Sequence, residues 1–153
     1  MIENRGRWTV RVVAAVFAAL LLLGSKAAAD VLITPAEAAL PSSADARLEL
    51  RGITRGPSLD QVSPKPATSV RSPFALKIKF APHNNAKVDI AAARVTYLKV
   101  PPVDLTGRLR KYTGSDGIDM PIAEAPAGTH ILRVELKDSL GRTSVSVIKL
   151  IVE

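Results

Sequence analysis

The sequence predicts an all-β fold: a two-sheet antiparallel sandwich of about seven strands, preceded by an N-terminal signal helix. Three observations predict it. Short apolar segments are separated by turn-forming residues at a spacing of about ten residues. The clearest of these segments alternate apolar and polar residues with a period of two. No segment from Asp30 onward carries an apolar stripe at helical spacing.

The signal helix is predicted from residues 1–29, which have the order of an export signal. Basic residues come first, residues 12–23 are continuously apolar, and three alanines at 27–29 follow. A membrane-spanning helix needs roughly 20 apolar residues, so this run is short. We expect cleavage after Ala29. A second small-x-small site ends at Ala38, and the remaining alternatives are an uncleaved anchor and a buried core helix. The basic start consists of Arg5, Arg7 and Arg11.

Composition narrows the function classes. The chain has no cysteine, which excludes a disulfide framework, a zinc ribbon, a thiol nucleophile and a lipoprotein anchor. Without residues 1–29 it keeps 17 basic and 13 acidic residues, a net charge of +4. The basic residues are spread out, so nucleic acid is not an expected partner. We expect a periplasmic or secreted protein that meets the membrane only through the signal segment before cleavage.

The mature chain divides into a leader and a domain. Residues 30–46 are rich in Ala, Pro and Ser and predict a flexible leader. Residues 47–153 form the predicted domain, and its first strand is expected at 47–54. Residues 56–73 contain four prolines, which predict a loop or a sheet edge.

The clearest strand covers residues 74–80, with Lys77 and Lys79 on the face opposite the apolar side chains. Further strands are expected at 87–90, 94–100, 103–112 and 118–122, with Gly107 marking a bulge. Residues 128–152 form a hairpin of two long strands, in which Asp138 is a turn residue that caps its own backbone.

Residues 126–142, Pro-Ala-Gly-Thr-His-Ile-Leu-Arg-Val-Glu-Leu-Lys-Asp-Ser-Leu-Gly-Arg, look like the closing hairpin of bacterial immunoglobulin-like and fibronectin type III-like domains. In those domains a turn glycine precedes an alternating strand that ends in Asp-x-x-Gly. Ser72-Pro73-Phe74 resembles the entry to one of their inner strands. The chain departs from antibody domains because it has no Cys pair and no Trp after Trp8. The resemblance implies an immunoglobulin-like sandwich and an exported accessory or adhesive-type module.

No residue pattern predicts catalysis, a cofactor or a metal. His83 lies in a turn, and His130 shares a strand face with Leu132, so neither indicates a zinc site. Ser115 lacks the G-x-S-x-G context of a hydrolase nucleophile. Asp116 and Asp119 supply too few oxygens for calcium. An enzyme of unrecognised type is the least favoured reading.

The candidate contact residues form two groups: the lysine pair of the clearest strand, and a basic cluster in which Arg108 and Arg110 would share one strand face. A solvated sheet face explains the same residues without a partner. If the two groups are contact faces, the protein is predicted to be a non-catalytic binding or scaffolding module that contacts another envelope protein. The alternative partner is an anionic glycan, a polysaccharide or peptidoglycan, with a sugar stacked on Tyr112. The candidate residues are Lys77, Lys79, Arg108, Arg110, Lys111 and Tyr112.

Overall fold

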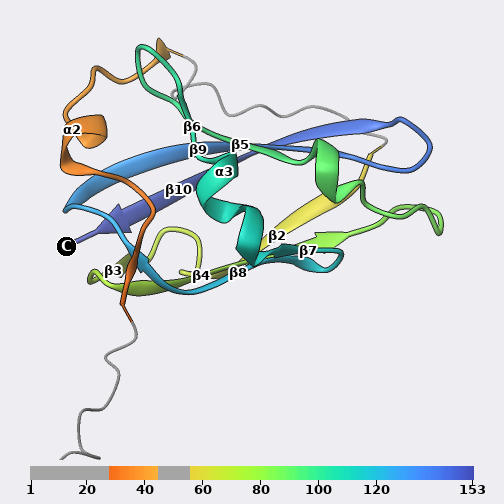
Figure 1. Ribbon diagram of the computed structural model, residues 1–153, viewed down its shortest axis with the longest axis horizontal. Helices are drawn as coiled ribbons and strands as arrows, with labels where there is room; N and C mark the ends of the chain where they lie inside the picture. Colours follow the sequence, from red (N-terminus) through yellow and green to blue (C-terminus); the bar gives the residue numbers. More distant parts are fainter. Residues whose placement is uncertain (1–27, 45–55) are drawn as a thin grey trace, which may run out of the picture.

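A computed structural model describes residues 28–44 and 56–153 and shows an all-β protein of two facing sheets (Figure 1). The first sheet has the strand order β1-β8-β4-β2, with β7 also paired to β8. The second has the order β3-β10-β9-β5-β6. The strands are β1 (Asp30–Val31), β2 (Ser58–Ser63), β3 (Ser69–Val70), β4 (Phe74–Ala81), β5 (Arg94–Tyr97), β6 (Val103–Asp104), β7 (Thr113–Gly114), β8 (Gly117–Glu124), β9 (Gly128–Lys137) and β10 (Thr143–Val152).

The predicted fold class is confirmed, with more strands than expected. Four of the ten described strands contain only two residues, which is too short for a period-two pattern to reveal. Two of these short strands, β1 and β3, pair in parallel with β8 and β10, and the remaining pairs are antiparallel. In the described part of the chain, no helix is long and apolar enough to cross a membrane.

The core lies between the two sheets and follows the predicted alternation. In β4, the side chains of Phe74, Leu76, Ile78 and Phe80 are buried, while the residues between them face outward. In β9, every second side chain from His130 to Leu136 is buried in the same way. Removing these apolar side chains from water is the main force that holds the sheets together. The predicted strands at 74–80 and in the 128–152 hairpin are therefore confirmed.

The proline-containing stretch between residues 56 and 73 carries the chain from one sheet to the other. It forms β2 at an edge of the first sheet and β3 at an edge of the second. A proline cannot donate a backbone hydrogen bond, so it is tolerated at sheet edges and at bulges, but it interrupts the regular ladder of a central strand. Pro57 and Pro64 stand directly before and after β2. The predicted loop or sheet edge is confirmed.

Residues 30–43, here called the N-terminal strap, belong to the folded domain, contrary to the flexible leader expected. β1 pairs with the end of β8, and Leu32 and Ile33 are 0% and 1% exposed. The strap then forms the short helix α2 (Pro35–Ala38) and reaches the second sheet, where Ser42 bridges to Lys99. The strap is attached to the core by two consecutive apolar residues. Because the surrounding residues are mostly Ala, Pro and Ser, the sequence pattern did not indicate their burial. Residues 1–27 of the predicted signal segment, residues 45–46 of the expected leader and the predicted strand at 47–54 lie outside the described residues.

The strand predicted at 103–112 is wrong beyond β6. The chain instead forms the helix α3 (Thr106–Leu109) and a 3-10 turn, η4 (Arg110–Tyr112), which lead from β6 to β7 (Figure 1). The Asp104 carboxylate accepts a hydrogen bond from the Thr106 backbone N–H at 2.8 Å, which favours a turn over an extended strand. Leu105 and Leu109 are both buried, four residues apart, as one face of a helix requires. Gly107 is therefore a helical residue and not a bulge.

Two of the other expected strands are shortened. The strand at 87–90 is reduced to a single bridge between Val88 and Asp138, followed by a 3-10 turn, η3 (Ile90–Ala92). The Asp89 carboxylate accepts hydrogen bonds from the backbone N–H groups of Ala91 and Ala92, which starts that turn. The strand at 94–100 ends at Tyr97, as β5. The strand at 118–122 is longer than expected, as β8.

Candidate functional site

The six candidate contact residues line two neighbouring shallow grooves, not one patch. The first, called the β4–β8 groove, has a volume of about 440 Å³ and lies over the outer face of the first sheet. The second, called the strap groove, has a volume of about 360 Å³ and lies where the strap meets α3 and η4. Lys77, Lys79 and Tyr112 line the β4–β8 groove; Arg108, Arg110 and Lys111 line the strap groove.

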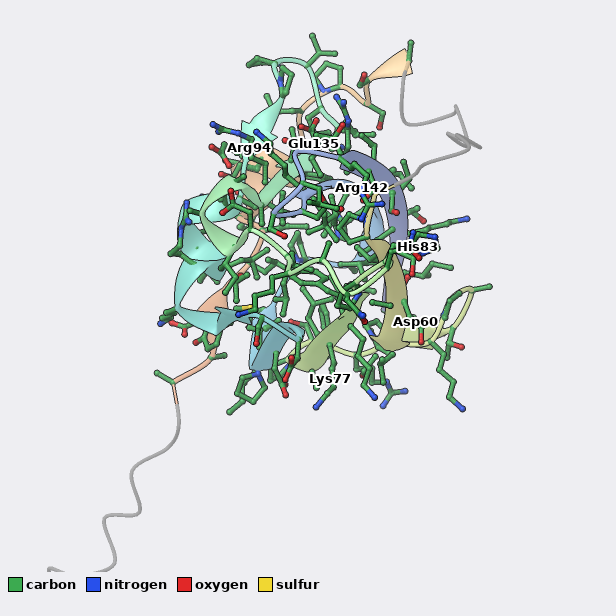
Figure 2. All side chains as sticks on the ribbon, turned by 90° about the vertical axis from the view of Figure 1, so that its right-hand side faces the viewer. Asp60, Lys77, His83, Arg94, Glu135 and Arg142 are labelled. Carbon is green, nitrogen blue, oxygen red and sulfur yellow. The ribbon has the colours of Figure 1, made fainter. Side chains whose placement is uncertain are left out.

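The two lysines of the β4–β8 groove differ in their partners. Both project outward from β4, and Figure 2 shows Lys77 pointing away from the core. Lys77 Nζ lies 2.8 Å from Asp119 Oδ2, directly across the β4–β8 pair. No described carboxylate lies within ion-pair distance of Lys79, whose neighbours across the strands are Asp60 and Gly117. Lys79 is therefore the cation of this groove that is available to a partner.

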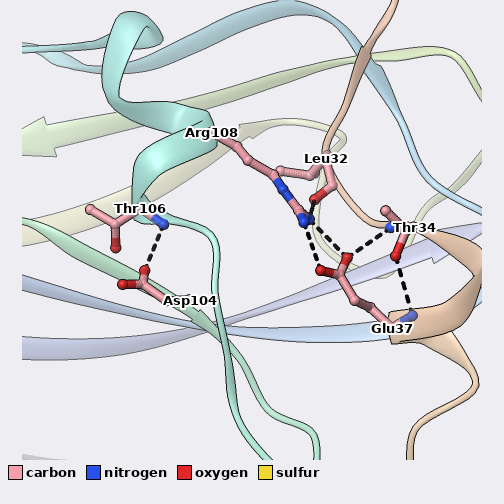
Figure 3. A network of polar contacts seen from close by, with 6 residues as sticks. All are labelled: Leu32, Thr34, Glu37, Asp104, Thr106 and Arg108. Atoms are coloured by element: carbon pink, nitrogen blue, oxygen red, sulfur yellow. Dashed lines mark hydrogen bonds and ion pairs between the residues drawn. The ribbon is translucent and has the colours of Figure 1, made fainter.

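Arg108 of the strap groove is committed to an internal ion pair (Figure 3). Its guanidinium donates two hydrogen bonds, of 2.6 and 2.8 Å, to the two carboxylate oxygens of Glu37 in α2. It also donates to the backbone carbonyl of Leu32 at 2.9 Å. The Glu37 carboxylate accepts from the Thr34 backbone N–H, and the Thr34 hydroxyl accepts from the Glu37 backbone N–H, so the two residues form a capping box. Arg108 thus fastens α3 to the strap.

The expected arrangement of the basic cluster is therefore wrong. Arg108 lies in α3 and Arg110 in η4, so they do not share a strand face with Lys111 opposite. An Arg108→Glu substitution would place a carboxylate against Glu37 and would therefore lower the stability of the fold. Arg110 remains exposed, with one long contact of 3.5 Å to the Ile90 carbonyl.

Replacing Arg108 with alanine is expected to lower the free energy of unfolding by about 2 kcal/mol, because Glu37 and the Leu32 carbonyl lose charge-assisted hydrogen bonds in a half-buried site. Arg110→Ala is the matched control and should change stability by less than about 0.5 kcal/mol. Urea unfolding followed by circular dichroism measures both. Equal losses for the two variants would contradict the role given to Arg108.

The same ion pair makes the free energy of unfolding depend on pH in the acidic range. The hydrogen bond from Arg108 holds the pKa of Glu37 at about 2, below the usual 4.5. A lowered pKa in the folded state stabilises the fold above pH 4.5, and this contribution is lost as the pH falls toward 2. We expect Glu37→Gln to be less stable than the parent at neutral pH, with the difference shrinking between pH 4.5 and 2. Urea unfolding over this range measures it; a difference independent of pH would contradict the prediction.

Tyr112 is held by neighbours on two sides. Its hydroxyl donates a hydrogen bond to the Asp30 carboxylate, which also pairs with Lys111 Nζ at 2.7 Å. The Lys111 ammonium lies 5.0 Å from the centroid of the Tyr112 ring, in position for a cation–π interaction. Tyr112 also packs against the core. Because one ring face already meets a cation and the hydroxyl is bonded, the ring is a poor platform for a sugar.

A buried polar network, which sequence reasoning missed, joins the strap to the second sheet. Lys99 is 7% exposed, and its ammonium donates to the carbonyls of Ala38 and Leu40 at 2.8 and 2.9 Å. The Tyr97 hydroxyl lies 2.8 Å from His130 Nδ1, and His130 Nε2 lies 2.8 Å from the Pro126 carbonyl. Burial lowers the pKa of His130, so the imidazole is neutral at pH 7. The network stabilises the contact between the strap and the second sheet. The sequence around Lys99 gave no indication that this lysine is buried.

The other polar residues considered in the sequence lie in or beside turns. Ser115 Oγ lies 3.2 Å from an Asp116 carboxylate oxygen in the exposed β7–β8 turn, and His83 is exposed, as predicted. Asp138 accepts hydrogen bonds from the backbone N–H groups of Leu140 and Arg142, which confirms its turn-capping role. Within residues 28–44 and 56–153, no group of three or more His, Cys, Asp or Glu side chains could hold a metal ion.

Comparison with known proteins gives no relative for this chain: no protein-family model matches it, and neither a curated protein nor a solved structure does. Its function is therefore inferred from the fold and from the two grooves.

Proposed function

We propose that this protein is an exported, non-catalytic binding or scaffolding module with an immunoglobulin-like sandwich, and that it contacts another protein of the cell envelope through the β4–β8 groove. Export is inferred from the order of basic, apolar and small residues in the first 29 positions. The mature charge of +4 favours a partner with an acidic surface.

The strand order supports the immunoglobulin-like assignment. In such domains the second and fifth strands of the fold are neighbours in one sheet, while the third, sixth and seventh lie side by side in the other. Here β4 and β8 are neighbours in the first sheet, and β5, β9 and β10 are consecutive in the second. The same five strands carry most of the buried core.

The observation that carries the proposed contact is Lys79. Its side chain projects from the outer face of the first sheet into an open groove, and no described carboxylate lies within ion-pair distance of its ammonium, although Asp60 stands opposite it on β2. The groove is bounded by the β7–β8 turn and by Tyr112, which is held in place by Asp30. A fixed rim beside an unpaired cation suits an acidic side chain of a protein partner. Electrostatic complementarity of this kind gives specificity more than affinity.

A polysaccharide or peptidoglycan ligand is the second candidate, and the geometry favours it less. Sugar recognition by stacking needs an open aromatic face, whereas the ammonium of Lys111 lies against the ring of Tyr112. The other tyrosine, Tyr97, is buried in the core. The groove therefore offers charge and shape to a ligand, but no free ring on which a sugar could stack.

We expect Lys79→Glu to weaken partner binding about tenfold, because it replaces the available cation with a like charge for an acidic partner. Lys65→Glu, in an exposed turn on another part of the surface, is the control with the same change in net charge. The tagged domain is crosslinked in its native envelope and retained proteins are identified by mass spectrometry. Binding of the purified partner to parent and variants is then measured by calorimetry.

Three outcomes separate the hypotheses. Loss of binding with Lys79→Glu but not with Lys65→Glu supports the β4–β8 groove. Equal binding by both variants contradicts that groove as the contact site. Retention of glycan without a protein partner overturns the proposal in favour of the carbohydrate reading.

A further inference from the structure

We propose that His130 and Lys99 form an acid-sensitive pair, here called the acid latch: protonation of the buried His130 imidazole releases residues 38–43 of the N-terminal strap from the second sheet. Three features carry the proposal. Both side chains are buried, both imidazole nitrogens are already bonded, and the Lys99 ammonium holds the strap. The release requires neither the proposed partner nor the β4–β8 groove.

The His130 ring has no free nitrogen, in a site that is 2% exposed. Nε2 lies 2.8 Å from the Pro126 carbonyl, which can only accept, so Nε2 carries the proton. Nδ1 is then the unprotonated nitrogen, and it accepts from the Tyr97 hydroxyl at 2.8 Å. A proton added in acid therefore binds Nδ1 and reverses this bond. The Tyr97 hydroxyl must turn its hydrogen away, and no other described group accepts it.

The added charge also acts on a second buried cation. The Lys99 ammonium lies 5.2 Å from the centroid of the Tyr97 ring, and the His130 ring packs edge-on against the same ring, with centroids 5.6 Å apart. Among the described residues, no carboxylate lies within ion-pair distance of either Lys99 or His130. Two uncompensated cations in one buried site repel each other strongly, because little water is present to screen them.

The repulsion acts on the residue that attaches the strap. The Lys99 ammonium donates to the carbonyls of Ala38 and Leu40 at 2.8 and 2.9 Å. It is relieved when Lys99 turns out to solvent, and the strap then loses both of these hydrogen bonds. Charging His130 therefore weakens the contact between the strap and the second sheet, although the histidine itself does not touch the strap carbonyls.

The remaining groups around His130 do not compensate for its charge. β10 places the apolar Leu150 opposite it in the sheet. On the strap, Glu37 acts electrostatically on Tyr97, but its carboxylate is neutralised by the Arg108 guanidinium. The pKa of Glu37 is about 2 and burial raises that of Tyr97 from its ordinary 10, so neither group titrates between about pH 7.5 and 5.5. A change in the strap over this range therefore reports on a histidine.

The direction of the pH effect follows from the pKa of His130. Burial lowers this pKa from its ordinary 6.5, and Lys99 lowers it further, against the opposing effect of the Pro126 carbonyl. A lowered pKa stabilises the attached strap above pH 6.5, and this contribution is lost as the pH falls through the lowered value. One unit below the ordinary pKa, a single proton favours the released strap by at most about tenfold.

Two measurements on the purified protein test the acid latch. NMR titration of the histidine side chains gives the pKa of His130, and hydrogen exchange gives the protection of backbone amides at about pH 7.5 and 5.5, corrected for the intrinsic exchange rate. The reporters are the N–H groups of Ser43 and Val100, whose backbone hydrogen bonds join the strap to the second sheet. The N–H of Leu32, which is bonded to the first sheet, is the internal control.

We expect the protection of both reporters to fall several-fold, up to the limit of about tenfold, while that of Leu32 stays constant. An equal fall at all three amides would mean that the whole domain opens. No fall at the reporters would mean that His130 does not hold the strap. Either result overturns the proposal.

Three variants identify the groups involved. His130→Gln keeps a donor and an acceptor but does not titrate, so it should abolish the pH dependence of the reporters. His83→Gln, at the only other histidine, which is exposed, is the matched control and should preserve it. Lys99→Met should raise the pKa of His130, a shift that a purely structural role of the lysine would not produce.

The acid latch is contradicted if the pH dependence survives in His130→Gln, or if Lys99→Met leaves the pKa of His130 unchanged. Should a variant fail to fold, the two measurements on the parent protein still decide the proposal.

Discussion

Gly117→Ala is expected to lower the free energy of unfolding by about 3 kcal/mol or more. A fraction of the protein molecules should then fail to fold. Gly117 has a φ of +146°, a backbone conformation that side chains rarely adopt. A Cβ at this position would lie 1.9 Å from the carbonyl oxygen of Ile78 in the adjacent strand β4. That oxygen belongs to the β4–β8 ladder and cannot move away without disturbing the pairing of Ile78 with Ile118.

The matched control is Gly114→Ala, in the same β7–β8 hairpin, where an added Cβ meets nothing within 4 Å. Thermal and urea unfolding of the two variants give the comparison. We expect the control to remain within about 0.5 kcal/mol of the parent. Because Gly117 also lines the β4–β8 groove, a Gly117→Ala protein that still folds should bind the partner more weakly. Equal stability of the two variants would show that the close approach of β4 and β8 at Gly117 is incorrect.

Leu32→Ala is expected to lower the free energy of unfolding by about 3 kcal/mol, within the 2–5 kcal/mol usual for a buried leucine. The side chain is 0% exposed and belongs to the core between the two sheets. The cost combines lost apolar burial with the cavity left behind. Val31→Ala is the control, because Val31 directly precedes Leu32 in the chain and is 44% exposed.

Chemical unfolding of both variants, at neutral pH, measures this prediction. A large loss for Leu32→Ala beside a small one for Val31→Ala would establish that the strap is part of the cooperative domain. If Leu32→Ala were as mild as the control, the strap would be a detachable leader and not part of the cooperative domain.

The long strands were predictable because each has one face in the core and one in water. Phe74 and Leu76 in β4 alternate with outward residues, and Leu132 and Val134 do so in β9. A strand with one buried and one exposed face requires apolar and polar residues to alternate, and this alternation is visible in the sequence. The turn at Asp138 was predictable for a local reason, since its carboxylate caps backbone groups only a few residues away.

The predictions were wrong where the structure of a short segment depends on contacts with residues far away in the sequence. Leu32 and Ile33 are only two apolar residues in a segment rich in Ala and Pro, and their burial depends on β8, which is far along the chain. Leu105 and Leu109 fit an alternating pattern and a helical one equally well, because a separation of four residues satisfies both periods. The Asp104 cap and the packing of both leucines select the helix.

The candidate site was predictable in part for the same reasons. The outward position of Lys77 and Lys79 follows from the alternation of β4, but the neutralising contact of Lys77 with Asp119 depends on the register between two strands. The commitment of Arg108 to Glu37 depends on the strap reaching α3. Several basic residues that are close in the sequence are therefore already paired within the protein. Fewer cations are available to a partner than the sequence suggested.

The pairing of the strap with β8 has a consequence for the order in which this chain completes its fold. The first described strand meets residues 123–124, and the last backbone N–H, of Glu153, donates to the carbonyl of Val70. Contacts between such distant segments give a high contact order, and β-sandwiches of this type fold in milliseconds to seconds, roughly. A chain that emerges N-terminus first cannot pair β1 with β8 until residue 124 is free, and it cannot join Glu153 to Val70 until its last residue is free.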